Sequence, residues 1–194
     1  QGSESVMTIS PELIQQVVRE TVREVISRQD SGTDAPSGTD GIFTDMNSAV
    51  DAADVAWRQY MDCSLRDRNR FIQAIRDVAS EPDNLEYMAT ATVVPHKILK
   101  NRYAALYTPG TEDIITEAWS GDDGLTTVEF SPFGVIGAIT PTTNPTETVI
   151  NNTIGMLAAG NAVVFSPHPR AKKITLWLVR KINRALAAAG APAN

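Results

Sequence analysis

Side chains capable of covalent or acid–base chemistry are few in this chain. It has one cysteine, Cys63, and two histidines, His96 and His168, all far apart in the sequence. A reactive thiolate needs a neighbour that lowers its pKa, and the segment Met61-Asp62-Cys63-Ser64 supplies no histidine. We therefore interpret Cys63 as an inert thiol and expect no metal site. A single cysteine also excludes an internal disulfide and is typical of a reducing compartment.

Polar side chains gather first in residues 140–147, which read Thr-Pro-Thr-Thr-Asn-Pro-Thr-Glu. Asn144 is a favourable N-cap, Pro145 suits the first helical position, and Glu147 follows Asn144 by three residues, as in a capping box. We expect Asn144 and Glu147 to cap a helix, and Thr142 and Thr143 to satisfy backbone groups in the turn. A ligand contact stays open for Asn144, since one amide can cap a helix and still face a site.

A second polar group, residues 166–170, reads Ser-Pro-His-Pro-Arg. Its central residue, His168, lies between two prolines, which is typical of an exposed loop. On local chemistry alone, an exposed loop histidine and a ligand contact are equally compatible with this pattern.

The segments that position both polar groups have the hydrophobic patterns and lengths of a βαβ unit. Residues 135–139 and 162–165 are short apolar runs, typical of parallel strands, and we expect the first to be buried on both faces. A helix from Asn144 would end at Gly160, a natural C′ residue. The connection should be right-handed. Because parallel strands end at the same sheet edge, residues 140–144 and 166–170 should form adjoining walls of one groove.

The same stretch carries a family resemblance. Its motifs are Ser-Pro-Phe-Gly-Val-Ile-Gly (131–137), Thr-Pro-Thr-Thr-Asn-Pro-Thr (140–146) and Ala-Gly-Asn-Ala-Val-Val-Phe-Ser-Pro-His-Pro-Arg-Ala (159–171). They resemble the cofactor domain of the aldehyde dehydrogenase superfamily. The similarity is greatest to the CoA-acylating propionaldehyde and acetaldehyde dehydrogenases of bacterial microcompartments. Non-acylating members have Pro-Trp-Asn-Phe-Pro at residues 141–145 and Lys-Pro at residues 166–167.

The resemblance implies an α/β fold, with N-terminal helices followed by part of a Rossmann-like parallel-sheet NAD-binding domain. The usual G-x-G-x-x-G fingerprint is absent, so the nucleotide would be held in a variant manner. The implied cofactors are NAD and coenzyme A. By resemblance, Asn144 is a candidate oxyanion contact. The residues implied to line the cofactor groove are Ile139, Thr140, Pro141 and Thr142 on the first strand end, and Ser166, Pro167, His168 and Pro169 on the second. Hydroxyls suit ribose and pyrophosphate, and prolines can wall an adenine.

The resemblance also implies an activity for a longer parent protein. That protein would oxidise a short-chain aldehyde to its acyl-CoA with NAD and CoA, through a cysteine thiohemiacetal and thioester. The nucleophile would lie outside this chain, so we expect the chain alone to be inactive. A non-acylating aldehyde dehydrogenase and a non-catalytic targeting or scaffold module are the alternatives. A homo-oligomer is expected because relatives are oligomers.

The N-terminal part divides by composition. Residues 1–6 resemble a tag remnant, residues 7–28 are predicted to form an amphipathic helix, and residues 29–40 are predicted to be a flexible linker. The apolar stripe of the helix consists of Leu13, Ile14, Val17, Val18, Val22, Val25 and Ile26. By resemblance, residues 10–28 would target the enzyme to a microcompartment in the cytoplasm, by binding shell proteins or co-packaged enzymes. Packing on its own domain or a sister subunit is the alternative.

Residues 41–194 would hold the helical lead-in and the first half of the cofactor domain, without the catalytic domain. Their patterns predict helices over residues 46–60, from Ser64 with Asp67 as a capping-box partner, and over 84–91, 97–106 and 170–189. A strand is predicted over residues 126–131, and the segment near Val94 departs from the family pattern. The net charge of −6 argues against nucleic acid, and no apolar run is long enough to span a bilayer.

Overall fold

The computed structural model describes residues 38–92, 105–111, 116–129 and 131–192. The chain divides into two units, residues 1–34 and 35–194, and every described residue belongs to the second. The tag remnant, the targeting helix, the linker up to residue 37, most of the predicted helix 97–106 and the segment near Val94 lie outside the described residues.

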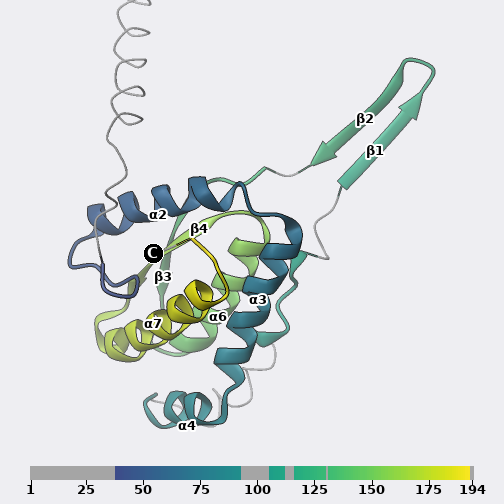
Figure 1. Cartoon of the computed structure of the whole chain (residues 1–194). Helices are drawn as coiled ribbons and strands as arrows, with labels where there is room; N and C mark the ends of the chain where they lie inside the picture. The colour runs from purple at the N-terminus through teal and green to yellow at the C-terminus, as the bar shows by residue number, and fades with distance from the viewer. Residues whose placement is uncertain (1–37, 93–104, 112–115, 130, 193–194) are drawn as a thin grey trace, which may run out of the picture. The chain divides into compact units, whose positions relative to one another are not determined.

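The second unit contains helices α2 (Met46–Tyr60), α3 (Leu65–Ser80), α4 (Pro82–Thr90), α6 (Pro145–Ala158) and α7 (Lys172–Ala188). Its strands are β1 (Thr116–Gly121), β2 (Gly124–Glu129), β3 (Val135–Thr140) and β4 (Ala162–Pro167), and a single 3₁₀ turn, η2 (Pro169–Ala171), precedes α7 (Figure 1). The predictions of α2, α3, α4, α6 and α7 are confirmed, within about two residues at their ends.

Helix α3 begins as the sequence predicts. The Ser64 hydroxyl accepts a hydrogen bond from the Asp67 N–H at 3.2 Å, and the Asp67 carboxylate accepts one from the Ser64 N–H at 3.1 Å. The Ser64 hydroxyl, which also donates to the Asp67 carboxylate at 2.6 Å, and the Ser64 N–H hold the pKa of Asp67 below its ordinary value. The apolar side chains of Phe71, Ile72 and Ile75 are buried on one side of the helix, whereas Leu65 in the first turn is exposed.

The βαβ unit is confirmed. Strands β3 and β4 pair in parallel, with Val135 opposite Ala162 and Thr140 opposite Pro167, and α6 connects them. Helix α6 ends at Gly160, whose φ of 82° is a left-handed conformation that glycine adopts without strain. The N–H groups of Gly160 and Asn161 then bond to the carbonyls of Leu157 and Met156, which forms a Schellman motif.

The prediction that β3 is buried on both faces is wrong. Ala138 and Thr140 are buried, whereas Gly137 and Ile139 on the opposite face are exposed, Ile139 by 84%. The alternation shows that the described part of the chain covers only one face of β3 near its end.

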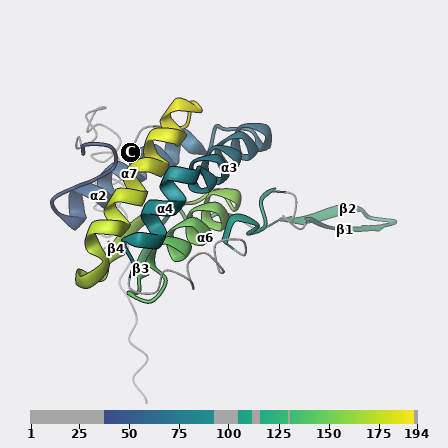
Figure 2. The same ribbon diagram turned by 90° about the horizontal axis from the view of Figure 1, so that it is seen from below.

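Helices α3, α6 and α7 pack on one another, as both views show, and supply most of the main core (Figure 2). The largest fully buried apolar side chains of that core are Phe71, Ile72, Ile75, Met88, Val149, Ile150, Ile154 and Leu178. These residues form the support against which β3 and β4 lie.

Helix α2 is fixed to the C-terminal end of α6 by two aromatic donors. The Trp57 indole N–H donates to the Gly160 carbonyl at 3.0 Å, and the Tyr60 hydroxyl donates to the Leu157 carbonyl at 2.8 Å. Burial raises the pKa of the Tyr60 hydroxyl, so it remains a donor at neutral pH. The final carbonyls of a helix lack intrahelical partners, and α2 therefore binds where partners are needed.

Asn161 joins the end of α6 to the start of β3. Its side-chain carbonyl accepts hydrogen bonds from the N–H groups of Phe133, at 2.6 Å, and Gly134, at 3.1 Å. Asn161 is buried, so both N–H groups would lose their partner without it. This side chain thus fixes how the two strands begin side by side.

Strand β1 was not predicted from the sequence. It pairs with β2 in an antiparallel hairpin whose two-residue turn is Asp122-Asp123, with Gly121 opposite Gly124. The Gly-Asp-Asp-Gly turn was an available signal for a hairpin. Its apolar side chains Trp119, Leu125 and Val128 are exposed, so the hairpin contributes little to the core.

The predicted linker 29–40 extends too far toward the C-terminus. Asp40 lies within the folded unit, because its carboxylate accepts two hydrogen bonds from the Arg184 guanidinium of α7, at 2.6 and 2.9 Å. Thr39 and Ile42 also form an isolated β-bridge. A composition rich in Gly, Ser, Thr and Asp cannot distinguish a flexible tether from a turn held by ion pairs.

Asn161→Ala should destabilise the chain by about 2–3 kcal/mol, because one buried and one partly buried N–H group lose their acceptor. Urea unfolding followed by circular dichroism measures this change. Asn151→Ala is the matched control: Asn151 is exposed and makes one side-chain hydrogen bond, to Thr108, so a loss below about 1 kcal/mol is expected. Equal losses for the two variants would contradict the role given to Asn161.

Candidate functional site

The two polar loops lie side by side, as the sequence predicts. Ile139 is opposite Ser166 in the sheet register, and the His168 N–H donates to the Thr140 carbonyl at 3.1 Å. The first loop, residues 140–144, and the second loop, residues 166–170, therefore leave the sheet from adjacent positions at its carboxyl edge. Ligands of open parallel sheets bind at this edge.

The first loop presents both apolar and polar groups. Ile139 is exposed just before it, Pro141 and Thr142 are half-buried, and Thr143 is exposed. Thr140 differs, because its side chain is fully buried and its hydroxyl has no hydrogen-bond partner among the described residues. Its carbonyl is bonded to His168, so Thr140 joins the two loops and does not offer its hydroxyl to solvent.

The predicted capping box at α6 does not form. Asn144 occupies the N-cap position, but its side chain makes no capping hydrogen bond and instead accepts one from the Thr143 hydroxyl at 2.8 Å. Glu147 is buried and its carboxylate accepts from the Thr146 hydroxyl at 2.9 Å, with the other oxygen unpaired among the described residues. Asn144 is thus the N-cap residue, as predicted, but the side-chain capping bonds expected of Asn144 and Glu147 are absent. The helix still begins at Pro145, because proline needs no N–H partner there.

The second loop carries the other predicted residues. Ser166 and Pro167 are half-buried, while His168 and Pro169 are exposed. The Nδ1 atom of His168 accepts a hydrogen bond from the Arg170 N–H at 3.2 Å, which caps η2. A neutral His168 must then carry its proton on Nε2, so the ring can present a donor away from the turn.

A cavity of about 230 Å³ opens beside the second loop. It lies between β4, the segment before α2 and the first two turns of α7. The lining comprises Gly41, Ile42, Phe43, Thr44, Asp45, Met46, Ala49, Ala53, Val163, Val164, Phe165, Ser166, Pro167, Lys172, Leu176 and Val179. Sequence analysis missed the contribution of residues 41–46 and of Lys172, because neither belongs to the motifs that carry the family resemblance.

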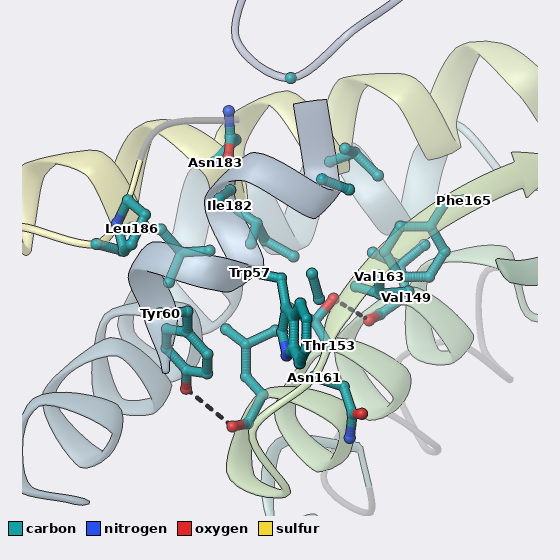
Figure 3. A pocket seen from close by; sticks show the side chains of 18 residues that line it. Trp57, Tyr60, Val149, Thr153, Asn161, Val163, Phe165, Ile182, Asn183 and Leu186 are labelled. Atoms are coloured by element: carbon teal, nitrogen blue, oxygen red, sulfur yellow. Dashed lines mark hydrogen bonds between the residues drawn. The ribbon is translucent and has the colours of Figure 1, made fainter. Parts of the chain in front are cut away.

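A second cavity, of about 120 Å³, lies among α2, α6, α7 and β4 (Figure 3). Trp57, Tyr60, Val149, Phe165, Ile182 and Leu186 make its wall predominantly apolar. It contains none of the predicted cofactor residues. Both cavities share Gly41, Ala53, Val163, Phe165 and Val179, so they run along the edge of β4 that faces away from β3.

Cys63 lies in the turn between α2 and α3, not at the strand ends. Desolvation and the nearby Asp67 carboxylate raise the pKa of its thiol, so its environment favours the unreactive form. Its thiol approaches the Gln59 carbonyl at 3.9 Å. In the part of the chain that the structure describes, no group of three metal-ligating side chains occurs and no helix is long and apolar enough to cross a membrane.

Comparison with known proteins agrees with this arrangement. Residues 19–194 match the aldehyde dehydrogenase family. The chain is 43% identical over 168 residues to the propanal dehydrogenase (CoA-propanoylating) of Citrobacter freundii, covering 83% of this chain and 36% of that protein. The chain belongs to the aldehyde dehydrogenase family, and it spans about a third of the length of the curated relatives it matches.

Solved structures give the same result. A propionaldehyde dehydrogenase of Rhodopseudomonas palustris, with bound CoA and an acylated cysteine, is 57% identical with a TM-score of 0.74, over 80% of this chain and 37% of that one. A propionaldehyde dehydrogenase from the fucose utilisation bacterial microcompartment of Clostridium phytofermentans is 53% identical with a TM-score of 0.72, over 78% of this chain and 36% of that one. The predicted fold and family are confirmed.

Cys63→Ser in the longer protein should leave turnover within about twofold of the unmodified enzyme, because the thiol lies away from the strand ends and is held protonated. Steady-state rates with a short-chain aldehyde measure this. A loss of several hundredfold, with an unchanged melting temperature, would show that Cys63 is the nucleophile.

Proposed function

We propose that this chain is the N-terminal portion of an enzyme that oxidises a short-chain aldehyde to its acyl-CoA, with NAD and coenzyme A, inside a bacterial microcompartment. The observation that carries the proposal is the parallel register that places Ile139 opposite Ser166 and Thr140 opposite Pro167. This register unites two loops whose sequences resemble the acylating branch. Relatives named for CoA-dependent aldehyde oxidation support the substrate class.

We propose that the two loops bind the nucleotide cofactors. Ile139 and Pro141 would provide apolar contact, and Thr142 and Ser166 would bind ribose or pyrophosphate oxygens. His168, whose Nε2 faces away from the η2 turn, would donate to a phosphate or hydroxyl. Thr140, being buried, would position the loops through its carbonyl. Bound NAD would accept the hydride, while these residues hold and orient it.

Asn144 is the chain's candidate for stabilising a developing oxyanion. Its side-chain amide makes no capping hydrogen bond to α6, and its Nδ2 donors have no partner among the described residues. An amide donor fixed beside a reacting carbonyl would stabilise negative charge. The proposed cysteine nucleophile would come from outside this chain, since Cys63 lies elsewhere and is held protonated.

The unpaired edge of β4 supports the proposal that these residues form the first half of a larger cofactor domain. Within the described residues β4 pairs only with β3, and an apolar trough of two cavities follows its other edge. Ala191 and Pro192, which follow α7, line the second of these cavities, the one of about 120 Å³. A further parallel strand of the longer protein would pair with this edge of β4 and fill the 120 Å³ cavity, which leaves the 230 Å³ cavity beside the second loop open.

Two alternatives differ in class and in outcome. A non-acylating aldehyde dehydrogenase would have the Pro-Trp-Asn-Phe-Pro pattern, which residues 141–145 lack. A non-catalytic targeting or scaffold module needs no cofactor groove, so the union of the two loops argues against it.

The deciding experiment is a substrate panel on the complete protein. Acetaldehyde and propionaldehyde with NAD and CoA should raise the nicotinamide absorbance and yield acyl-CoA by mass spectrometry. Omitting CoA should abolish steady turnover, because the acyl group then stays on the enzyme. Free carboxylate formed without CoA would establish the non-acylating alternative, and no reduction of NAD would establish the non-catalytic one.

We further propose that residues 10–28 direct the enzyme into the microcompartment. Deleting residues 7–37, which retains the Asp40–Arg184 pair, should leave NAD affinity nearly unchanged and abolish co-purification with shell proteins. As a matched pair, Val18→Glu would charge the predicted apolar stripe, whereas Gln16→Glu would alter only the polar face. Packaging that survives both the deletion and Val18→Glu would exclude this targeting role.

Homo-oligomerisation also remains a proposal. The β1–β2 hairpin exposes Trp119, Leu125 and Val128, and a two-stranded hairpin is marginal alone, so a second copy is a suitable partner. Sedimentation of the complete protein at several concentrations tests this, and a monomer throughout would exclude it.

A further inference from the structure

The cavity beside the second loop contains a cation that the predicted cofactor motifs do not include. Lys172 lines this cavity together with Ser166 and Pro167, which stand at the end of β4. Lys172 is the first residue of α7 and is exposed, so its ammonium group can reach a ligand from solvent.

This cation has no structural partner. Among the described residues, Arg170, Lys172 and Lys173 form no ion pair, whereas Arg180 and Arg184, further along α7, both lie within 4.0 Å of Asp40. The first turn of α7 contains no acidic residue. Cations near a helix N-terminus oppose the helix dipole, so α7 gains no stability from Lys172. What distinguishes Lys172 from the equally unpaired Lys173 is that Lys172 lines the cavity, so its charge is available to an anion bound there.

The cavity has the composition of an adenosine site with a cationic end. Its apolar lining includes Phe43, Met46, Ala49, Leu176 and Val179, while Thr44 and Ser166 offer hydroxyls. The one carboxylate in the lining, Asp45, is already engaged, because its two oxygens accept hydrogen bonds from the Ser48 N–H and hydroxyl at 2.9 and 2.7 Å. The cavity thus offers contacts for a flat apolar base, a ribose and an anion.

We propose that Lys172 is a specificity-determining residue that binds a phosphate monoester on the ribose of an adenosine cofactor. The inference rests on the proposed function, which places such a cofactor at the ends of β3 and β4. Coenzyme A carries this group at the ribose 3′ position and NADP carries it at the 2′ position, whereas NAD carries none. An ammonium group attracts a phosphate dianion as a point charge, without the fixed geometry of arginine.

The test is a comparison of nucleotide fragments, and it requires no turnover. Adenosine 3′,5′-bisphosphate represents CoA, adenosine 2′,5′-bisphosphate represents NADP, and 5′-AMP lacks the extra phosphate. Binding of each to the complete protein is measured by titration calorimetry at low salt. At least one bisphosphate should bind about tenfold more tightly than 5′-AMP, and the preferred isomer identifies the source of the phosphate.

The variants Lys172→Gln and Lys173→Gln form a matched pair. Both residues are exposed lysines on the first turn of α7, but only Lys172 lines the cavity. Lys172→Gln should remove most of the preference for the bisphosphate and leave 5′-AMP affinity within about twofold, while Lys173→Gln should retain the preference. Equal melting temperatures would show that neither change affects folding.

Two results would overturn the inference: equal affinities for 5′-AMP and both bisphosphates in the unmodified protein, or equal weakening of all three ligands by Lys172→Gln. Failure of the proposed function is seen separately, as absence of CoA-dependent NAD reduction in the unmodified protein. In the active enzyme, CoA and 3′-dephospho-CoA provide a second readout. Lys172→Gln should raise KM for CoA toward that for dephospho-CoA without changing kcat.

Discussion

The parallel pairing of β3 with β4 is the constraint on which the rest of this structure depends. Two parallel strands need a crossover connection, and here α6 provides it. Four bonds keep that crossover in place: the Trp57 and Tyr60 side chains bind the carbonyls at the end of α6, and Asn161 binds two N–H groups at the start of β3. The position of the two polar loops follows from these bonds, because each loop begins where its strand ends.

The candidate site consists of accessible polar groups that form no complete set of bonds within the described part of the fold. Thr140 and Glu147 are buried and Cys63 is remote, so they are poorly placed to meet a ligand from solvent. Asn144, His168 and Lys172 remain accessible, and each has a donor or charge that the described residues do not satisfy. Both open features, the face of β3 around Ile139 and the free edge of β4, agree with a chain that spans about a third of its relatives.

Local sequence patterns predicted elements well where one interaction dominates. The capping box of Ser64 and Asp67, the glycine stop at Gly160 and the apolar stripe of α7 each depend on neighbours within a few residues. The pattern at Asn144 failed for a related reason: the residue types of a capping box were present, but Glu147 packed inward under the influence of the surrounding core. The hairpin was not predicted because β1 shows little alternation of apolar and polar residues. The Gly-Asp-Asp-Gly sequence of its turn is nevertheless typical of a hairpin.

The sequence by itself determined the βαβ order, the family and the pair of loops that meet at the sheet edge. Strand period and glycine positions depend mainly on residues close in the sequence, so they can be recognised without knowing what packs around them. Only the tertiary structure decided which side chains in those loops are accessible, that Asp40 is tied to α7, and that Lys172 shares a cavity with Ser166. Burial and contact between distant segments depend on how helices pack against a sheet, and no short stretch of residues specifies that packing.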